Sequence, residues 1–126
     1  MFRNTIRSIS LLVLLLAVSE NSLADVPESQ APEVDYLIRS LKTSGCEMIR
    51  NGKSYDGEAA AAHVRLKYDY FRDEIFSTQE FIERAATRST MSGKAYMVDC
   101  PGEEPIPSAD WLQNKLKAYR KKQDRL

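Results

Sequence analysis

Residues 44–71 read SGCEMIRNGKSYDGEAAAAHVRLKYDYF, and the rest of the chain can be interpreted outward from them. Asn51-Gly52 separates two short mixed runs, and both residues tolerate the positive φ that a two-residue hairpin turn requires. Asp56 then offers a side-chain oxygen suited to an N-cap, and Glu58 places negative charge in the first turn of the next helix. These residues therefore predict a strand, a tight turn, a second strand and a helix.

The flanking segments extend this pattern to an α+β domain. Before the third helix, the predicted elements are helix Glu33–Ser44, hairpin arms Cys46–Arg50 and Lys53–Tyr55, and helix Gly57–Ile75. Ser77 and Glu80 form an S-x-x-E capping pattern, which predicts that the third helix starts there and runs to about Arg88. Strand Lys94–Cys100, loop Pro101–Pro107 and a final helix capped by Ser108 complete the predicted chain. The order αββααβα predicts one domain over residues 33–126, in which a hairpin plus a third strand form a small antiparallel sheet packed against about four helices.

The predicted helix over Gly57–Ile75 carries two neighbouring apolar stripes. The first comprises Ala59, Ala62, His63, Leu66 and Tyr70, and the second comprises Ala60, Val64, Tyr68 and Phe71. Together they predict one wide buried face, with Lys67 and the other charged residues largely on the remaining surface.

Residues 1–24 have the features of a signal peptide. Arg3 and Arg7 form a basic region, Ile9–Val18 is apolar, and Ser22-Leu23-Ala24 is a small-x-small cleavage site. The apolar core of about ten residues is too short to span a bilayer, and no cysteine follows the site to carry a lipid. We expect an exported soluble protein without a stable membrane anchor, cleaved after Ala24, with a flexible lead-in over residues 25–32; an uncleaved anchor is the alternative.

The two cysteines, Cys46 and Cys100, are predicted to form a disulfide. An oxidising compartment favours pairing, and closing a loop of this length stabilises a small domain by roughly 4 kcal/mol in the chain-entropy model. The alternative is a redox or metal site, but the chain has no C-x-x-C motif and only one histidine. We therefore expect no metal and no cofactor.

The formal net charge of the chain narrows the class of partner that we expect. The signal region contains Arg3, Arg7 and Glu20 as its only charged residues, so the remaining chain has a formal net charge of about −1. A dedicated nucleic-acid binder would usually be strongly basic, so nucleic acid is not an expected partner. The basic tail, Lys115–Leu126, could contact anionic lipid or cell-wall polymers, or simply complement the dipole of its helix.

Catalytic motifs are weak. Gly52-Lys53-Ser54 resembles the end of a P-loop, but position 47 is glutamate and a strand follows in place of a helix. His63 is the only candidate general base at neutral pH, and no G-x-S-x-G or S-x-x-K motif supplies a nucleophile. The sequence favours a structural His63 at the core edge, hydrogen-bonded to a backbone carbonyl or a tyrosine. No catalytic residue is assigned, and the alternative is an envelope-polymer hydrolase that uses His63.

Two polar turns form the candidate binding surface: Arg50, Asn51 and Lys53 at the hairpin tip, and Ser92 and Lys94 in the Ser92-Gly93-Lys94 turn. Each lysine follows a glycine, which lets a ligand approach the backbone. The same composition also suits ordinary surface turns. A second candidate is a carbohydrate or peptide platform around Tyr68, Asp69 and Tyr70, although core packing on one side and solvated charge on the other is the commoner arrangement.

Several separated motifs resemble one known family. They are Ser44-Gly45-Cys46, Arg50-Asn51-Gly52-Lys53-x-Tyr55, Ala-x-His63-Val64-x-Leu66-Lys67-Tyr68, Phe81-Ile82, Ser92-Gly93-Lys94-x-Tyr96, Cys100-Pro101 and Trp111-Leu112. In this order they are similar to the YfeK-like family of small exported bacterial proteins, a family of unknown function, over about Val34–Arg120. The resemblance implies a Gram-negative periplasmic location, one domain and no established activity.

The sequence as a whole predicts a non-catalytic binding domain whose partner is another envelope protein or cell-wall material. An inhibitor or immunity-type protein is a further alternative, and its signature would be a prominent loop inserted into a partner's cleft. The oligomeric state is left open.

Overall fold

The fold is that of a computed structural model, and the structure describes residues 25–126. The predicted signal peptide and its cleavage site lie outside that range. The elements are α1 Ala31–Thr43, β1 Glu47–Arg50, β2 Lys53–Tyr55, α2 Gly57–Phe71, the short 3₁₀ helix η1 Arg72–Glu74, α3 Thr78–Ala86, β3 Met97–Asp99, β4 Ile106–Pro107 and α4 Ser108–Gln123. The predicted α+β fold is confirmed. Among residues 25–126, no helix is long and apolar enough to cross a membrane.

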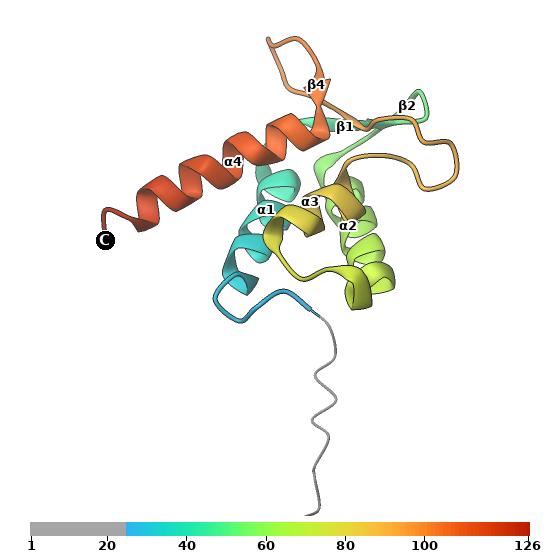
Figure 1. The fold of residues 1–126 in the computed structure, drawn as a ribbon. Helices are drawn as coiled ribbons and strands as arrows, with labels where there is room; N and C mark the ends of the chain where they lie inside the picture. The colour runs from blue at the N-terminus through green and yellow to red at the C-terminus, as the bar shows by residue number, and fades with distance from the viewer. Residues whose placement is uncertain (1–24) are drawn as a thin grey trace, which may run out of the picture.

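The sheet is antiparallel and has four strands in the order β2-β1-β3-β4. Three of them were predicted, and β4 replaces the end of the predicted Pro101–Pro107 loop, where Val98 pairs with Ile106. A two-residue strand that contains a proline gives no strand pattern in sequence, and proline is tolerated only at an edge. In Figure 1 the strands lie together at one end of the molecule, beside α2 and the start of α4.

Two of the three predicted helix caps are confirmed. Asp56 Oδ1 accepts a hydrogen bond from the Ala59 backbone N–H at 2.8 Å, and Ser77 Oγ accepts one from Glu80 N–H at 3.0 Å. The prediction that Ser108 caps the last helix is wrong, because Pro107 occupies the N-cap position and the buried Ser108 Oγ has no hydrogen-bond partner among residues 25–126. The chain therefore enters α4 directly from β4.

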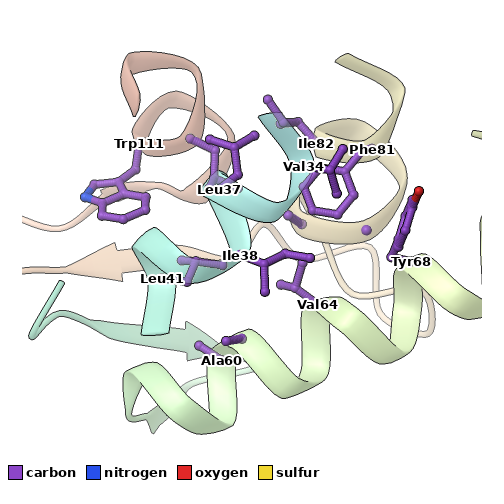
Figure 2. Close-up of a cluster of buried hydrophobic side chains, with 14 of the residues drawn as sticks. Val34, Leu37, Ile38, Leu41, Ala60, Val64, Tyr68, Phe81, Ile82 and Trp111 are labelled. Atoms are coloured by element: carbon purple, nitrogen blue, oxygen red, sulfur yellow. The ribbon is translucent and has the colours of Figure 1, made fainter. Parts of the chain in front are cut away.

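The core lies between the helices and one side of the sheet, as Figure 2 shows. Its main side chains come from α1 (Val34, Leu37, Ile38 and Leu41), α2 (Ala60, Val64 and Tyr68), α3 (Phe81 and Ile82) and α4 (Trp111). Helices α1, α2 and α3 pack against one another, and α4 packs on α1 and α3. This packing gives the sheet and its turns a fixed support.

The prediction of one wide buried face on α2 is wrong. Ala60, Val64 and Tyr68 are buried, whereas Leu66 is 68% exposed and Tyr70 is 80% exposed. Helices α1 and α3 pack on the second stripe, and so most residues of the first stripe face outward. Tyr68 and Tyr70 therefore do not form a joint platform: one lies in the core and the other in solvent.

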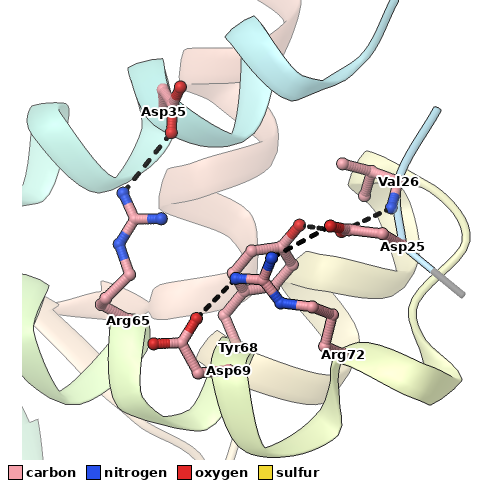
Figure 3. A network of polar contacts seen from close by, with 7 residues as sticks. All are labelled: Asp25, Val26, Asp35, Arg65, Tyr68, Asp69 and Arg72. Carbon is pink, nitrogen blue, oxygen red and sulfur yellow. Dashed lines mark hydrogen bonds and ion pairs between the residues drawn. The ribbon is translucent and has the colours of Figure 1, made fainter. Parts of the chain in front are cut away.

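The segment predicted as a flexible lead-in over residues 25–32 is packed against the domain. Helix α1 already begins at Ala31, and Val26 is buried. Asp25 accepts hydrogen bonds from the Tyr68 hydroxyl and from Arg72 Nη1 (Figure 3). Burial, together with the Asp25 hydrogen bond, raises the pKa of Tyr68 to about 12. The acidic Asp25 and the apolar Val26 were predicted to belong to a flexible linker, but they anchor the segment to the domain.

Helix α4 is tied to α1 by a buried carboxylate. Glu33 is 9% exposed and accepts hydrogen bonds from Arg120 Nε at 2.6 Å and Nη2 at 3.0 Å, while Thr78 Oγ1 donates to it at 2.8 Å. These bonds lower the pKa of Glu33, the one to Arg120 most, against the opposing effect of burial. Sequence reasoning did not identify this contact, because its partners are 87 residues apart.

The predicted disulfide between Cys46 and Cys100 is confirmed. Cys46 precedes β1 and Cys100 follows β3, next to the paired residues Glu47 and Asp99 at one end of these two strands. The bond therefore joins the two central strands of the sheet.

Candidate functional site

The hairpin tip forms as predicted. Arg50 pairs with Lys53 across the turn, and Asn51 and Gly52 have φ values of 50° and 78°. Positive φ at both central positions matches the twist of the two strands, and asparagine and glycine accept it most readily. As a result, Asn51, Gly52 and Lys53 project from the sheet as an exposed tip.

The second polar turn lies in the loop between α3 and β3. Its base is closed by the bridge between Arg88 and Ala95 and by a hydrogen bond from Ser89 N–H to the Lys94 carbonyl at 2.9 Å. Ser92 Oγ accepts a bond from Lys94 N–H at 3.2 Å, and Ser89 Oγ accepts one from Ser92 N–H at 3.2 Å. Local hydrogen bonds therefore define the conformation of this turn.

The two turns lie side by side. Ser92 Oγ donates to Asn51 Oδ1 at 2.5 Å, and Asn51 Nδ2 donates to Ser89 Oγ at 3.4 Å. Four of the five predicted binding residues, Asn51, Lys53, Ser92 and Lys94, thus belong to one exposed surface, which we call the two-turn surface. Among the described residues, Lys53 and Lys94 form no ion pair.

Arg50, the fifth predicted residue, has different neighbours. Its guanidinium carbon stacks 3.9 Å from the centre of the Tyr55 ring, and its Nη1 lies 2.7 Å from His63 Nδ1. His63 Nε2 lies 3.1 Å from the Tyr96 hydroxyl, which also accepts a hydrogen bond from Lys67 Nζ at 3.2 Å. Arg50, His63, Lys67 and Tyr96 form a connected group, which we call the Tyr96 cluster.

His63 is neutral in this environment. Burial, together with the positive charges of Arg50 and Lys67, lowers its pKa to about 4. The predicted tyrosine hydrogen bond is confirmed, but the stripe that contains His63 does not bury it, because its four other members, Ala59, Ala62, Leu66 and Tyr70, are exposed. The contacts of His63 come instead from strand β1 and from Tyr96, which precedes β3.

The expectation of a surface position for Lys67 is wrong. The residue is only 9% exposed, and its Nζ donates to the Arg88 carbonyl at 2.7 Å as well as to Tyr96. Burial lowers the pKa of Lys67, and the neighbouring Arg50 and Arg88 charges act in the same direction. Lys67 is four residues after His63, and this spacing could have suggested that both side chains lie on one face of the helix. The sequence did not show which partner buries Lys67.

Comparison with known protein families matches residues 28–120 to a family of unknown function, DUF5329. The chain belongs to the DUF5329 family. It is 27% identical over 85 residues to the uncharacterised protein YfeK of Salmonella typhimurium strain LT2, a match that covers 67% of this chain and 71% of YfeK. No solved structure matches the chain.

In the Tyr96 cluster of this DUF5329 domain, the side chains mainly offer hydrogen-bond donors. Arginine cannot accept a hydrogen bond, so the Nδ1 lone pair of His63 must face the Arg50 guanidinium. A ring nitrogen engaged by a permanent cation is poorly placed to take a proton from a substrate. Four surface depressions among residues 25–126 are lined by other side chains, and His63 lines none of these four.

A metal site is not indicated either. Within the described part of the chain, no group of three or more histidine, cysteine, aspartate or glutamate residues is arranged to hold a metal ion. The two cysteines are consumed by the disulfide. The arrangement of the two-turn surface and the Tyr96 cluster is suited to attracting anions.

Proposed function

We propose that this DUF5329 protein is an exported periplasmic interaction domain that binds an anionic group without catalysing a reaction. The anionic group belongs to another envelope protein or to cell-wall material. The two-turn surface (Asn51, Lys53, Ser92 and Lys94) makes the contact. The signal-peptide features of residues 1–24 support the location.

The observation that carries the proposal is the hydrogen bond between Ser92 and Asn51. It joins two turns that are 41 residues apart in the chain and brings their glycine-lysine pairs into one surface. Neither lysine forms an ion pair among the described residues. Lys53 Nζ lies 5.5 Å from the centre of the Tyr55 ring, and this contact leaves its hydrogens available to an anion. A surface whose backbone is already ordered loses less entropy when it binds.

The environment of His63 favours binding over the alternative of an envelope-polymer hydrolase. Its pKa of about 4 is far below the neutral range in which a general base works best, and its two ring nitrogens contact Arg50 and Tyr96. The chain therefore offers two surface cations for recognition, and its histidine contributes to structure.

The test uses the double variant Lys53→Ala/Lys94→Ala. A photo-crosslinking amino acid is placed at Thr90, an exposed loop residue, so that capture does not depend on lysine chemistry. The secreted protein is cross-linked in envelope extract at low and high salt. We expect the double variant to capture less partner, with the largest difference at low salt, where exposed charges are least screened.

The matched control is Lys117→Ala/Lys121→Ala, which removes two exposed cations from α4 and leaves the two-turn surface intact. Both double variants should melt close to the wild type, because surface substitutions usually change stability by no more than about 0.5 kcal/mol. Equal capture by wild type and Lys53→Ala/Lys94→Ala at every salt concentration would place the binding face elsewhere.

A further inference from the structure

The hydrogen atoms of the Tyr96 cluster can be assigned from its partners. The Arg50 guanidinium only donates, so His63 Nδ1 accepts and Nε2 carries the ring hydrogen. His63 Nε2 and Lys67 Nζ therefore both donate to the Tyr96 hydroxyl oxygen. That oxygen then accepts two hydrogen bonds, and its own hydrogen has no acceptor in the cluster.

A second donor in the cluster is also without an acceptor. Arg50 Nε is buried and has no hydrogen-bond partner among the described residues. Lys67 uses two of its three ammonium hydrogens, on the Arg88 carbonyl and on Tyr96. Buried polar groups in proteins are almost always paired, and so the unpaired donors of these neighbouring side chains point to an acceptor that binds to them.

The charges around these donors have one sign. Arg50 extends from β1, Lys67 and the neutral His63 lie on α2, and Arg88 follows α3. Among residues 25–126, none of the three cations lies within ion-pair distance of a carboxylate. Of the three, Lys67 is buried, Arg50 is half-buried and Arg88 is exposed. A buried cation such as Lys67 is costly without a counter-charge, so an anion held beside it would stabilise the folded domain.

We propose that Arg50, Lys67 and Tyr96 form a binding site for a single carboxylate group. Arg50 Nη1 is taken by His63, and the edge that contains Nε is the one that arginine uses side-on to hold both oxygens of a carboxylate. The Tyr96 hydroxyl and the remaining Lys67 hydrogen complete the donor set. Arg50 and His63 are half-buried, so the cluster reaches the protein surface.

This site is separate from the two-turn surface and goes beyond the proposed function. Its donors are buried or half-buried, whereas Lys53 and Lys94 are exposed. Its side-on arginine edge selects a planar group with two acceptor oxygens. Its ligand is a carboxylate either at the end of a peptide or on a small organic acid.

The experiment is an NMR titration of the folded secreted domain at constant ionic strength. The probes are sodium acetate as a small acid and N-acetylalanine as a peptide carboxylate. N-acetylalaninamide, which lacks the charge, and inorganic phosphate are the controls. The His63 ring signals and the backbone amides of Arg50 and Tyr96 are followed. We expect saturable shifts with at least one carboxylate probe, and the stronger of the two identifies the source of the ligand.

Variants tie the shifts to the named side chains. Arg50→Lys keeps the charge but loses the side-on edge, and we expect about tenfold weaker binding. Tyr96→Phe removes one donor and should weaken binding severalfold while keeping the ring in the core. Binding should also raise the pKa of His63, because an anion beside the ring favours its protonated form. Lys53→Ala/Lys94→Ala should bind the probe like the wild type, which separates this site from the proposed function.

The proposal is wrong if neither carboxylate produces saturable shifts, or if the amide or phosphate produces the same shifts. It is also wrong if both Arg50→Lys and Tyr96→Phe bind normally while folded, as judged by their amide spectra. Loss of probe binding in Lys53→Ala/Lys94→Ala would assign the carboxylate to the two-turn surface instead.

Discussion

Arg50 Nη1 lies 2.7 Å from His63 Nδ1, so the single histidine of the chain faces a permanent cation. Burial, together with the charges of Arg50 and Lys67, keeps the ring neutral at neutral pH, and the Arg50 contact fixes which nitrogen carries its hydrogen. The contact also joins strand β1 to helix α2. The lowered pKa of the ring makes the stability of the domain sensitive to pH.

We predict that the free energy of unfolding falls as the pH is lowered from about 6.5 toward 4. The pKa of His63 is lowered to about 4 in the folded protein, against a usual value of 6.5. The stabilisation from the neutral ring is therefore fully present above pH 6.5 and is lost as the pH falls through the folded pKa. In this window unfolding takes up about one proton at this residue. Urea unfolding at a series of pH values measures the slope.

His63→Gln keeps a polar side chain and removes the titrating group. The variant should melt lower than the wild type at pH 7 but lose this part of the pH dependence, and it should keep partner capture. Glu33 contributes separately below its own unfolded pKa, because its folded pKa is also lowered. An unchanged pH slope in the variant would contradict the assignment to His63, and loss of capture in a well-folded variant would revive a functional role for the ring.

Arg120→Met is predicted to destabilise the domain by about 1–3 kcal/mol, because it leaves the buried Glu33 carboxylate with one donor, Thr78, in place of three bonds. Chemical unfolding measures the loss. Arg65→Met is the matched control: Arg65 and Asp35 form an exposed ion pair at 3.4 Å, visible in Figure 3, which should contribute less than about 0.5 kcal/mol. Equal losses in the two variants would mean that burial of Glu33 does not matter.

Removing the disulfide with Cys46→Ala/Cys100→Ala is predicted to cost about 2–5 kcal/mol. The bond closes a loop with a sequence separation of 54 residues and joins the central strands β1 and β3. Urea unfolding of the oxidised wild type, the reduced wild type and the double variant gives the comparison, and mass spectrometry of secreted protein counts free thiols. The reduced wild type should match the variant. Two free thiols in secreted protein would contradict the pairing.

Local chemistry was readable from the sequence. Asn51-Gly52 predicted the hairpin because both residues accept positive φ, and Asp56 and Ser77 predicted helix starts because their oxygens satisfy free backbone N–H groups. The pairing of Cys46 with Cys100 followed from the number of cysteines and the predicted export. Each of these inferences depends on a residue and its near neighbours, or on composition.

The sequence alone also determined the α+β class and the two polar turns of the candidate surface. Only the tertiary structure decided which stripe of α2 is buried, because both stripes are apolar and the choice depends on where α1 and α3 pack. Tertiary packing also decides three other contacts. They are the hydrogen bond of the buried Lys67 to Tyr96, the contact of Asn51 with Ser92 and the bond of Glu33 to Arg120. These contacts join residues from 29 to 87 positions apart, and sequence periodicity reports only on neighbours within a few turns or strands.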